Sequence, residues 1–190
     1  MVRLVGSAAG ATAAVCGIGI AGVSFYAFNP WTALVSCLLG WAMLAIAIVD
    51  AQRFTIPDVL SLPAIPLGLL ASGWLHDPGS SQLVSLDHVI GACLGGAAFW
   101  LVREAYWRLR GREGLGLGDV KLAAAGGAWT GWEHLPDVVL LAAAGALSFA
   151  IALAAIRRGR LSATERLPFG AFLAPSIWAV WSLGAWARGF

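Results

Sequence analysis

Residues 111–132 read GREGLGLGDVKLAAAGGAWTGW and join a glycine-rich loop to an apolar segment. Asp119 opens that segment and Lys121 follows two positions later. Ionisable groups are costly in apolar surroundings, so their position here needs a reason. Asp119 could simply start a helix, because the helix dipole favours a negative charge at the N-terminus. The stretch alone therefore leaves a structural and a functional interpretation open.

The composition of the whole chain indicates a polytopic membrane protein. Of the 190 residues, 59% are hydrophobic and 12% are charged, and the mean hydropathy is +0.81. Soluble domains carry about 25% charged residues. The 10 tryptophans agree with this class, since Trp favours the membrane–water interface. A net charge of +2 without any block of basic residues gives no reason to expect a nucleic-acid partner.

Seven apolar segments predict an all-α, polytopic membrane helix bundle with six to seven transmembrane segments, in one membrane-embedded domain over residues 1–190. The expected segments are roughly 5–28, 31–49, 58–75, 88–107, 119–132, 137–156 and 168–187. The first has a charged start like a signal peptide, but its apolar body of about 24 residues is longer than a signal-peptide core, so we expect a retained span. The fifth is short and rich in glycine, which leaves open whether it crosses the membrane fully.

The basic residues predict the orientation of the bundle. With seven spans, eleven of the twelve Lys and Arg residues fall on one side, and only Arg188 falls on the other. The loops expected on the opposite side, 29–30, 76–88 and 133–137, contain no Lys or Arg. Since cytoplasmic loops carry the excess of basic residues, we expect a cytoplasmic N-terminus and an external C-terminus.

Three aspartates abut apolar segments on the predicted cytoplasmic side: Asp50, Asp58 and Asp119. Carboxylates at membrane depth usually mark function. Asp58 follows a proline and precedes VLSLPAI, which favours a mainly structural role at a helix N-terminus. Asp50 lies at the predicted C-terminus of a helix, where the dipole disfavours a negative charge. A functional pair of Asp50 and Asp119 is therefore one of the two interpretations that remain.

The residues around Asp119 support that pair without deciding it. Gly114, Gly116 and Gly118 permit positive φ and a close approach of another backbone. A flexible loop would explain them as well, and their spacing does not fit a dinucleotide-binding fingerprint. Lys121 and Asp119 point to nearly opposite faces of a helix, so we expect no ion pair between them. Lys121 is instead expected to reach lipid headgroups or to hold a substrate group.

Other catalytic and metal-binding chemistries find little support. The three cysteines lie far apart in apolar runs, without a CxxC, and are expected to be packing residues: Cys16, Cys37 and Cys93. The three histidines are expected at a surface or interface on the side away from the aspartates: His76, His88 and His134. Neither GxSxG nor HExxH occurs. We expect no metal and no cofactor.

Together, the motifs resemble the type IV prepilin peptidase family, membrane aspartyl proteases that include the archaeal preflagellin peptidases. GLGLGDVKL matches the GxGD signature of that family, and VDAQRFTIPD resembles its first motif, an aspartate at a helix end followed by a Pro-Asp pair. GGAWTGW and RLPFGAFLAP resemble the segments that follow, so the likeness covers about residues 40–180. Presenilin-like proteases share GxGD but fit less well, since Val49 stands where they have tyrosine and their Pro-Ala-Leu is absent.

The resemblance implies that Asp50 and Asp119 are the catalytic pair of an aspartic endopeptidase. Four further residues are implied to support the motif or bind substrate: Gly116, Gly118, Lys121 and Asp58. The implied partners are the lipid bilayer and a prepilin or pseudopilin, whose short basic leader is cleaved at the cytoplasmic face of the bacterial inner membrane, for a type IV pilus or a secretion system. Many bacterial relatives carry an insertion with cysteine pairs that is associated with N-methylation. The short loops here predict the peptidase core alone, without methyltransferase activity.

Two adjacent carboxylates share a proton near neutral pH, so one can activate water while the other hydrogen-bonds the scissile carbonyl. Such a pair requires the fold to bring spans two and five together, and the sequence does not say which aspartate is the base. The main alternative is a proton- or cation-coupled transporter using the same carboxylates, although such proteins place their sites near the bilayer midplane. A non-catalytic scaffold or a decayed homologue is a second alternative. No oligomeric state is indicated.

Overall fold

In a computed structural model, the described residues (2–75, 81–111, 114–156 and 167–189) form seven α-helices and no strand. The helices are α1 (Val2–Ala27), α2 (Pro30–Arg53), α3 (Asp58–Leu75), α4 (Ser81–Arg110), α5 (Leu117–Thr130), α6 (Leu135–Ile156) and α7 (Gly170–Ala187). Each corresponds to one predicted segment. Five of them, α1, α2, α3, α4 and α6, are long and apolar enough to cross a membrane. The all-α, polytopic membrane class is therefore confirmed.

Two boundaries differ from those predicted. Helix α2 continues past Asp50 to Arg53 and ends where Phe54 adopts a left-handed conformation (φ 53°) and donates its N–H to the Asp50 carbonyl. Helix α4 already begins at Ser81, so most of the loop expected over 76–88 is helical among the described residues. The reason is local, because no glycine or proline interrupts the chain between Ser81 and His88.

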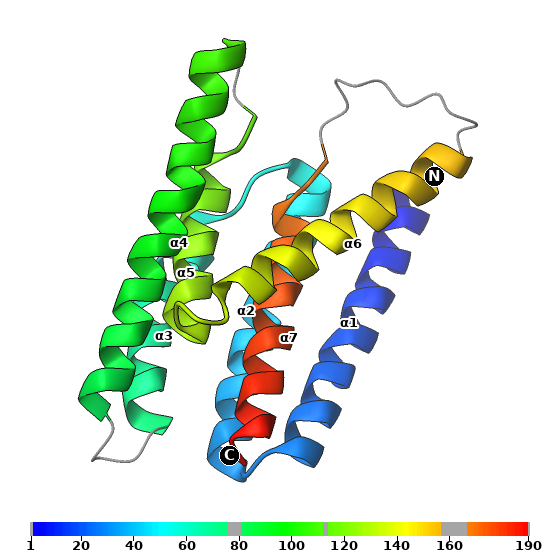
Figure 1. The fold of residues 1–190 in the computed structure, drawn as a ribbon. Helices are drawn as coiled ribbons and strands as arrows, with labels where there is room; N and C mark the ends of the chain where they lie inside the picture. The colour runs from blue at the N-terminus through cyan, green and yellow to red at the C-terminus, as the bar shows by residue number, and fades with distance from the viewer. Residues whose placement is uncertain (1, 76–80, 112–113, 157–166, 190) are drawn as a thin grey trace.

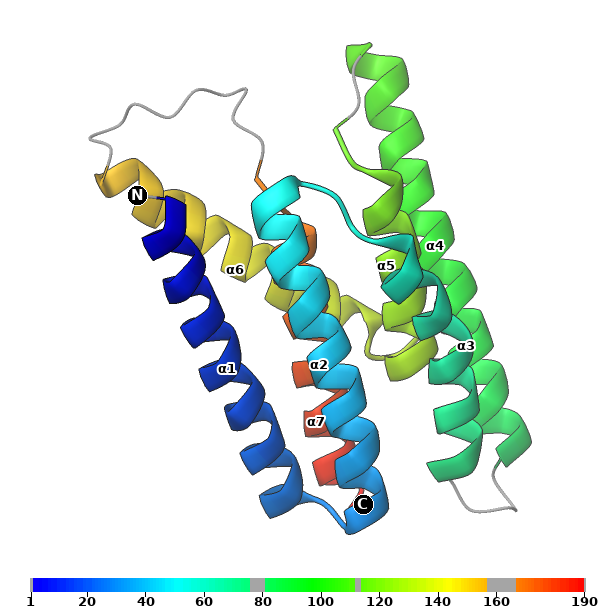
Figure 2. The same cartoon turned by 180° about the vertical axis from the view of Figure 1, so that it is seen from behind.

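The helices run alternately up and down. The five helix ends that contain or adjoin the predicted site residues therefore lie toward one end of the bundle, in the upper part of Figures 1 and 2. These are the C-terminal ends of α2 and α4 and the N-terminal ends of α3, α5 and α7; we call this region the site end. Arg53, Arg108 and Arg110 belong to the helix ends that gather there. The C-terminus of the chain lies at the opposite end (Figure 1).

The short helix α5 is the most enclosed element, packed against α3, α4 and α7. With 14 residues it is shorter than a bilayer core requires, and neither α5 nor α7 is among the five candidate spans. Whether these two cross the membrane therefore stays a prediction. Glycine makes the contact of α5 with α4 possible, since a Cβ on Gly127 would collide with the Gly91 backbone, and one on Gly95 with the Ala123 carbonyl. Small residues let membrane helices approach closely in this way.

Aromatic side chains join α5 to its other neighbours. The indole N–H of Trp129 donates to the Ala64 carbonyl of α3 at 2.8 Å. The same ring meets Trp181 of α7 edge to face, with centroids 5.8 Å apart. A buried indole needs a partner for its N–H, which the α3 backbone supplies here. The lower part of α5 is thus held from three sides.

Helix α1 packs against α2 at the edge of the bundle. The tight turn between them uses Asn29, whose side chain accepts the Thr32 N–H at 3.0 Å, followed by Pro30 at the first helical position. Further up, the indole of Trp41 donates to the Gly17 carbonyl at 3.1 Å. Most of the apolar span of α1 is exposed outside the bundle, as expected for a surface covered by lipid.

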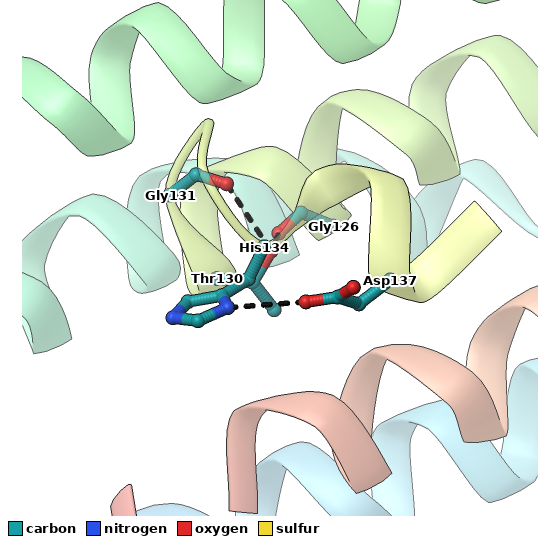
Figure 3. A network of polar contacts seen from close by, with 5 residues as sticks. All are labelled: Gly126, Thr130, Gly131, His134 and Asp137. Carbon is teal, nitrogen blue, oxygen red and sulfur yellow. Dashed lines mark hydrogen bonds and ion pairs between the residues drawn. The ribbon is translucent and has the colours of Figure 1, made fainter. Parts of the chain in front are cut away.

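The described histidines lie near the connection between α5 and α6, about midway along the bundle in Figures 1 and 2. His134 is exposed and lies 3.2 Å from Asp137 (Figure 3), in agreement with the predicted surface position. His88 is buried, with Nδ1 2.8 Å from the Ala128 carbonyl, so its predicted surface position is wrong. Because α4 starts early, His88 faces the last turn of α5, whose carbonyls lack partners within the helix. His76 lies outside the described residues.

Candidate active site

Asp50 is almost fully buried, with 5% of its surface exposed. Its Oδ2 accepts the N–H of Ala171 at 2.9 Å, and the N–H of Gly170 also donates to this carboxylate. Both donors belong to the first turn of α7, where N–H groups have no partner within the helix and the dipole favours an anion. An acid that its own helix disfavours is thus held by the N-terminus of another helix.

Asp119 lies in the first turn of α5 and is half-buried. Its Oδ2 accepts the N–H of Gly116, the residue that precedes the helix, at 3.2 Å. Burial raises the pKa of the Asp119 carboxyl to about 6, the charge of Asp50 adds to the rise, and the Gly116 N–H opposes it. Both carboxylates belong to the site end and lie close to Ile56: an added Cβ on Gly118, the residue before Asp119, would lie 2.8 Å from the Ile56 Cβ, and one on Gly170 would lie 2.7 Å from the Ile56 Cδ1 and 2.9 Å from the Asp50 Oδ2.

The two helices that carry these carboxylates meet in a different way from the one predicted. Helix α2 packs mainly against α1 and α7, and α5 mainly against α3, α4 and α7. Spans two and five therefore share α3 and α7 as neighbours rather than a long interface of their own within the described residues. The sequence predicted the pair of carboxylates but not the helices between them.

The glycines before Asp119 act differently from the expected backbone contacts. Gly116 has φ −75° and serves as the N-cap of α5, and positive φ among the described glycines occurs elsewhere, at Gly111, Gly131 and Gly189. None of Gly114, Gly116 and Gly118 therefore uses the positive φ that glycine permits. A Cβ on Gly114 would collide with the ring of Tyr106, and one on Gly118 would lie 2.8 Å from the Ile56 Cβ. These glycines make room for side chains of neighbouring segments.

Asp58 and Lys121 form an ion pair, with Oδ1 and Nζ 2.7 Å apart. Asp58 is the first residue of α3, in agreement with the prediction of a helix-starting acid. Lys121 pairs with Asp58 rather than with Asp119, so the pair ties the start of α3 to α5. Lys121 was expected at lipid headgroups or a substrate; in the structure its ammonium group is held by Asp58 beside the site.

Sequence reasoning did not single out three residues that complete the site: Ile56, Gly170 and Ala171. Ile56 is buried with 7% exposure, in the connection between α2 and α3. A Cβ on Gly170 would lie 2.7 Å from the Ile56 Cδ1 and 2.9 Å from the Asp50 Oδ2. The signals were present in TIPD and PFGAF, but neither motif shows which groups meet in space.

A cavity of about 830 Å³ lies between α2 and α3. Its walls come from both helices and include Met43, Val59, Leu67 and Trp74, with Trp129 of α5 also lining it. All of its lining side chains are apolar. No group of three or more His, Cys, Asp or Glu side chains that could hold a metal ion occurs in the described parts of the chain.

The fold defines a polytopic membrane protein with two carboxylates at neighbouring helix ends. The chain belongs to the type IV leader peptidase family, whose match covers residues 37–153 and both aspartates. It is 45% identical over 150 residues to the prepilin leader peptidase/N-methyltransferase of Burkholderia pseudomallei (strain 1026b), covering 77% of this chain and 46% of the relative.

More distant relatives have the same printed name. The Aeromonas salmonicida protein is 38% identical over 148 residues, or 78% of this chain and 48% of the relative. The Stutzerimonas stutzeri protein is 32% identical over 164 residues, or 86% of this chain and 54% of the relative. The chain thus spans about half the length of the curated relatives it matches. No solved structure matches significantly.

Proposed function

We propose that this chain is an aspartic endopeptidase that removes the leader of prepilin or pseudopilin substrates, with Asp50 and Asp119 as the catalytic pair. The observation that carries the proposal is that both carboxylates, from separate helices, lie at the site end around Ile56, inside the region that matches the leader peptidase family. The names of the relatives support the substrate class. The relatives' names also include N-methyltransferase, but paired carboxylates supply the acid–base chemistry of hydrolysis, so the proposal concerns cleavage.

The hydrogen bonds favour Asp50 as the general base. Burial opposes ionisation of this carboxylate, and the two N–H groups that it accepts from the start of α7 offset part of that cost, one donor more than Asp119 has. Asp119 accepts one N–H, from Gly116, and its raised pKa of about 6 favours retention of the shared proton. A bound substrate would remove more water from Asp119 and favour its protonated form further.

In the proposed reaction, Asp50 takes a proton from a water molecule as the water oxygen attacks the scissile carbonyl carbon. Asp119 donates a hydrogen bond to the carbonyl oxygen and stabilises the negative charge that develops there. Collapse of the tetrahedral intermediate breaks the C–N bond, and the proton held by Asp50 passes to the leaving nitrogen. The pair then returns to its starting state with one shared proton.

We propose that the site end faces the cytoplasm of a bacterial inner membrane. Arg53, Arg108 and Arg110 belong to helix ends in this region, and basic residues accumulate on the cytoplasmic side. A substrate with a short basic leader followed by an apolar helix would present the junction of the two at this surface. In contrast, an ion-coupled transporter would use polar groups near the midplane, whereas the cavity between α2 and α3 has an apolar lining.

Co-expression with a type IV prepilin tests the proposal directly. Leader removal, followed as a mobility shift and by mass spectrometry of the new N-terminus, should occur with wild type and be lost with Asp50→Asn and with Asp119→Asn. Asp137→Asn is the matched control, since this exposed aspartate lies in the first turn of α6, beyond the end of α5 that is remote from Asp119. Full processing by either site variant would overturn the assignment. Cation flux in liposomes without cleavage would favour the transporter.

A further inference from the structure

The connection between α2 and α3 buries one apolar side chain. Phe54 and Thr55 are exposed, and Pro57 is half-buried, but only 7% of Ile56 is accessible. The connection also begins four residues after Asp50 and ends at Asp58, whose carboxylate binds Lys121 of α5 at 2.7 Å. Ile56 is therefore held at a defined place beside both carboxylate-bearing helices.

Ile56 fills the space between two glycines that come from different helices. An added Cβ on Gly118 of α5 would lie 2.8 Å from the Ile56 Cβ, and one on Gly170 of α7 would lie 2.7 Å from its Cδ1. Real Cβ atoms are essentially never this close to another heavy atom. The isoleucine thus rests directly on the first turns of α5 and α7.

These two first turns contain the groups that form the site. Gly118 precedes Asp119, and Gly170 precedes Ala171, whose N–H donates to the Asp50 carboxylate at 2.9 Å. A buried side chain between them keeps the two turns apart, and its loss would leave a void that neighbouring groups fill only partly. The position of Asp119 relative to the Asp50 carboxylate therefore depends on the side chain between the turns.

We propose that Ile56 is a positioning residue that sets the separation of the Asp50 and Asp119 carboxylates by resting on Gly118 and Gly170. This inference rests on the proposed function, because the separation matters for a pair that shares a proton and activates water. Ile56 itself touches neither substrate nor the reacting atoms; it acts through the two helix starts. Catalysis is sensitive to such placement, since a shift of about 1 Å can cost about 100-fold in rate.

Steady-state cleavage of a purified prepilin by Ile56→Val and Ile56→Ala tests the proposal. We expect kcat to fall a few-fold for valine and by about 100-fold for alanine, with KM nearly unchanged. Ile151→Ala is the matched control, because it deletes the same atoms from a side chain of α6 that is 61% exposed. A wild-type kcat in Ile56→Ala, or a loss that lies only in KM, would overturn the proposal.

The titration of Asp119 tests the positioning role of Ile56 independently of peptidase activity. NMR of ¹³C-labelled aspartate in nanodiscs follows the titration of Asp119, which should move in Ile56→Ala and Ile56→Val but not in Ile151→Ala. If wild type cleaves no prepilin while the Asp119 titration still moves, the peptidase assignment fails and the positioning role stands. If the titration is the same in all variants, the positioning role fails.

A double-mutant cycle covers the case in which alanine at position 56 prevents folding. Valine lacks the Cδ1 atom that an added Cβ on Gly170 would meet at 2.7 Å. The added Cβ would also lie 2.9 Å from the Asp50 Oδ2 in both backgrounds, so Gly170→Ala should lower kcat in each, but less in the Ile56→Val background than in wild type. Additive effects would mean that the two residues are not coupled and would contradict the proposal.

Discussion

The two ends of α5 are held in different ways. The lower turns contact α4 backbone to backbone at Gly91 and Gly127, and Trp129 is hydrogen-bonded to the α3 backbone. The first turn contains the half-buried Asp119, a single capping bond from Gly116, and an ion pair at Lys121 that is partly open to solvent. The C-terminal (lower) end of α5 is close-packed through small residues. At the N-terminal (upper) end, which belongs to the site end, polar groups remain accessible.

The contrast between the two ends of α5 explains how a carboxylate can be held in position and still remain reactive. Close packing at the lower end fixes the axis of α5, so Asp119 does not need tight packing of its own. Asp50 has the opposite arrangement, because it is buried and held by the N–H groups of α7. A rigid acceptor of hydrogen bonds and a more accessible acid suit the two roles that we propose for them. The following experiments test this division.

The largest effect is expected at Asp119 itself. Asp119→Asn keeps a side-chain oxygen that can accept the Gly116 N–H but removes the titratable proton. We therefore expect cleavage of a prepilin to fall by at least about 1,000-fold, in the range seen when an essential catalytic group is lost, while thermal unfolding in detergent at pH 4 changes little. Strong loss of thermal stability together with activity would assign Asp119 a mainly structural role.

The next largest effect is expected at the lower end of α5. Gly127→Ala adds a Cβ that would collide with the Gly91 backbone, so we expect a destabilisation of about 1–3 kcal/mol from overpacking. Thermal unfolding in detergent measures this change. Gly19→Ala is the matched control, because an added Cβ at that position of α1 meets nothing within 4 Å. Equal melting temperatures for the two variants would contradict the close packing of α4 and α5.

Asp119, in the first turn of α5, should make both activity and stability depend on pH. The pKa of Asp119 is raised from 3.8 to about 6, so its protonated form, the proposed active one, is lost as the pH rises through about 6. We expect kcat/KM to decline over this range. Stability also falls as the pH rises. The contribution of Asp119 to the free energy of unfolding is fully present below pH 3.8 and is lost as the pH rises through about 6.

The pH dependence of stability that comes from Asp119 can be measured by comparing the melting temperatures of wild type and Asp119→Asn between pH 4 and pH 7. Aspartates remote from the site titrate in both proteins and cancel in the difference, which therefore reports on Asp119 and its coupled partner Asp50. The melting temperature of the variant should rise relative to wild type with increasing pH. A difference that does not depend on pH would mean that the pKa of Asp119 is not raised.

The smallest effect is expected for the ion pair between Asp58 and Lys121. Both side chains are partly exposed, at 58% and 32%, and exposed pairs contribute about 0–1 kcal/mol. Lys121→Met should therefore lower stability by less than about 1 kcal/mol, and Asp58→Asn should change little more in that background. If Lys121 also binds substrate, Lys121→Met will raise KM while Asp58→Asn leaves it unchanged.

Local patterns predicted much of this protein. The helices follow apolar runs and turn residues, such as the Asn29-Pro30 turn and the start of α3 at Asp58, because these depend on neighbours in the chain. Asp50 and Asp119 were recognisable as candidates since carboxylates rarely abut apolar helices. The burial of His88 was not predicted, because it depends on contact with α5, which begins 29 residues later in the chain.

The membrane class, the seven helical segments and the candidate acids can all be predicted from the sequence, since hydropathy, helix-breaking residues and charge are local properties. How the acids are held can be seen only in the folded structure. The hydrogen bond from the Ala171 N–H to Asp50 joins groups from separate helices. The packing of Ile56 between Gly118 and Gly170 does the same. Hydrogen bonds and steric contacts act over a few ångströms, so which distant residues meet follows from how the helices pack together.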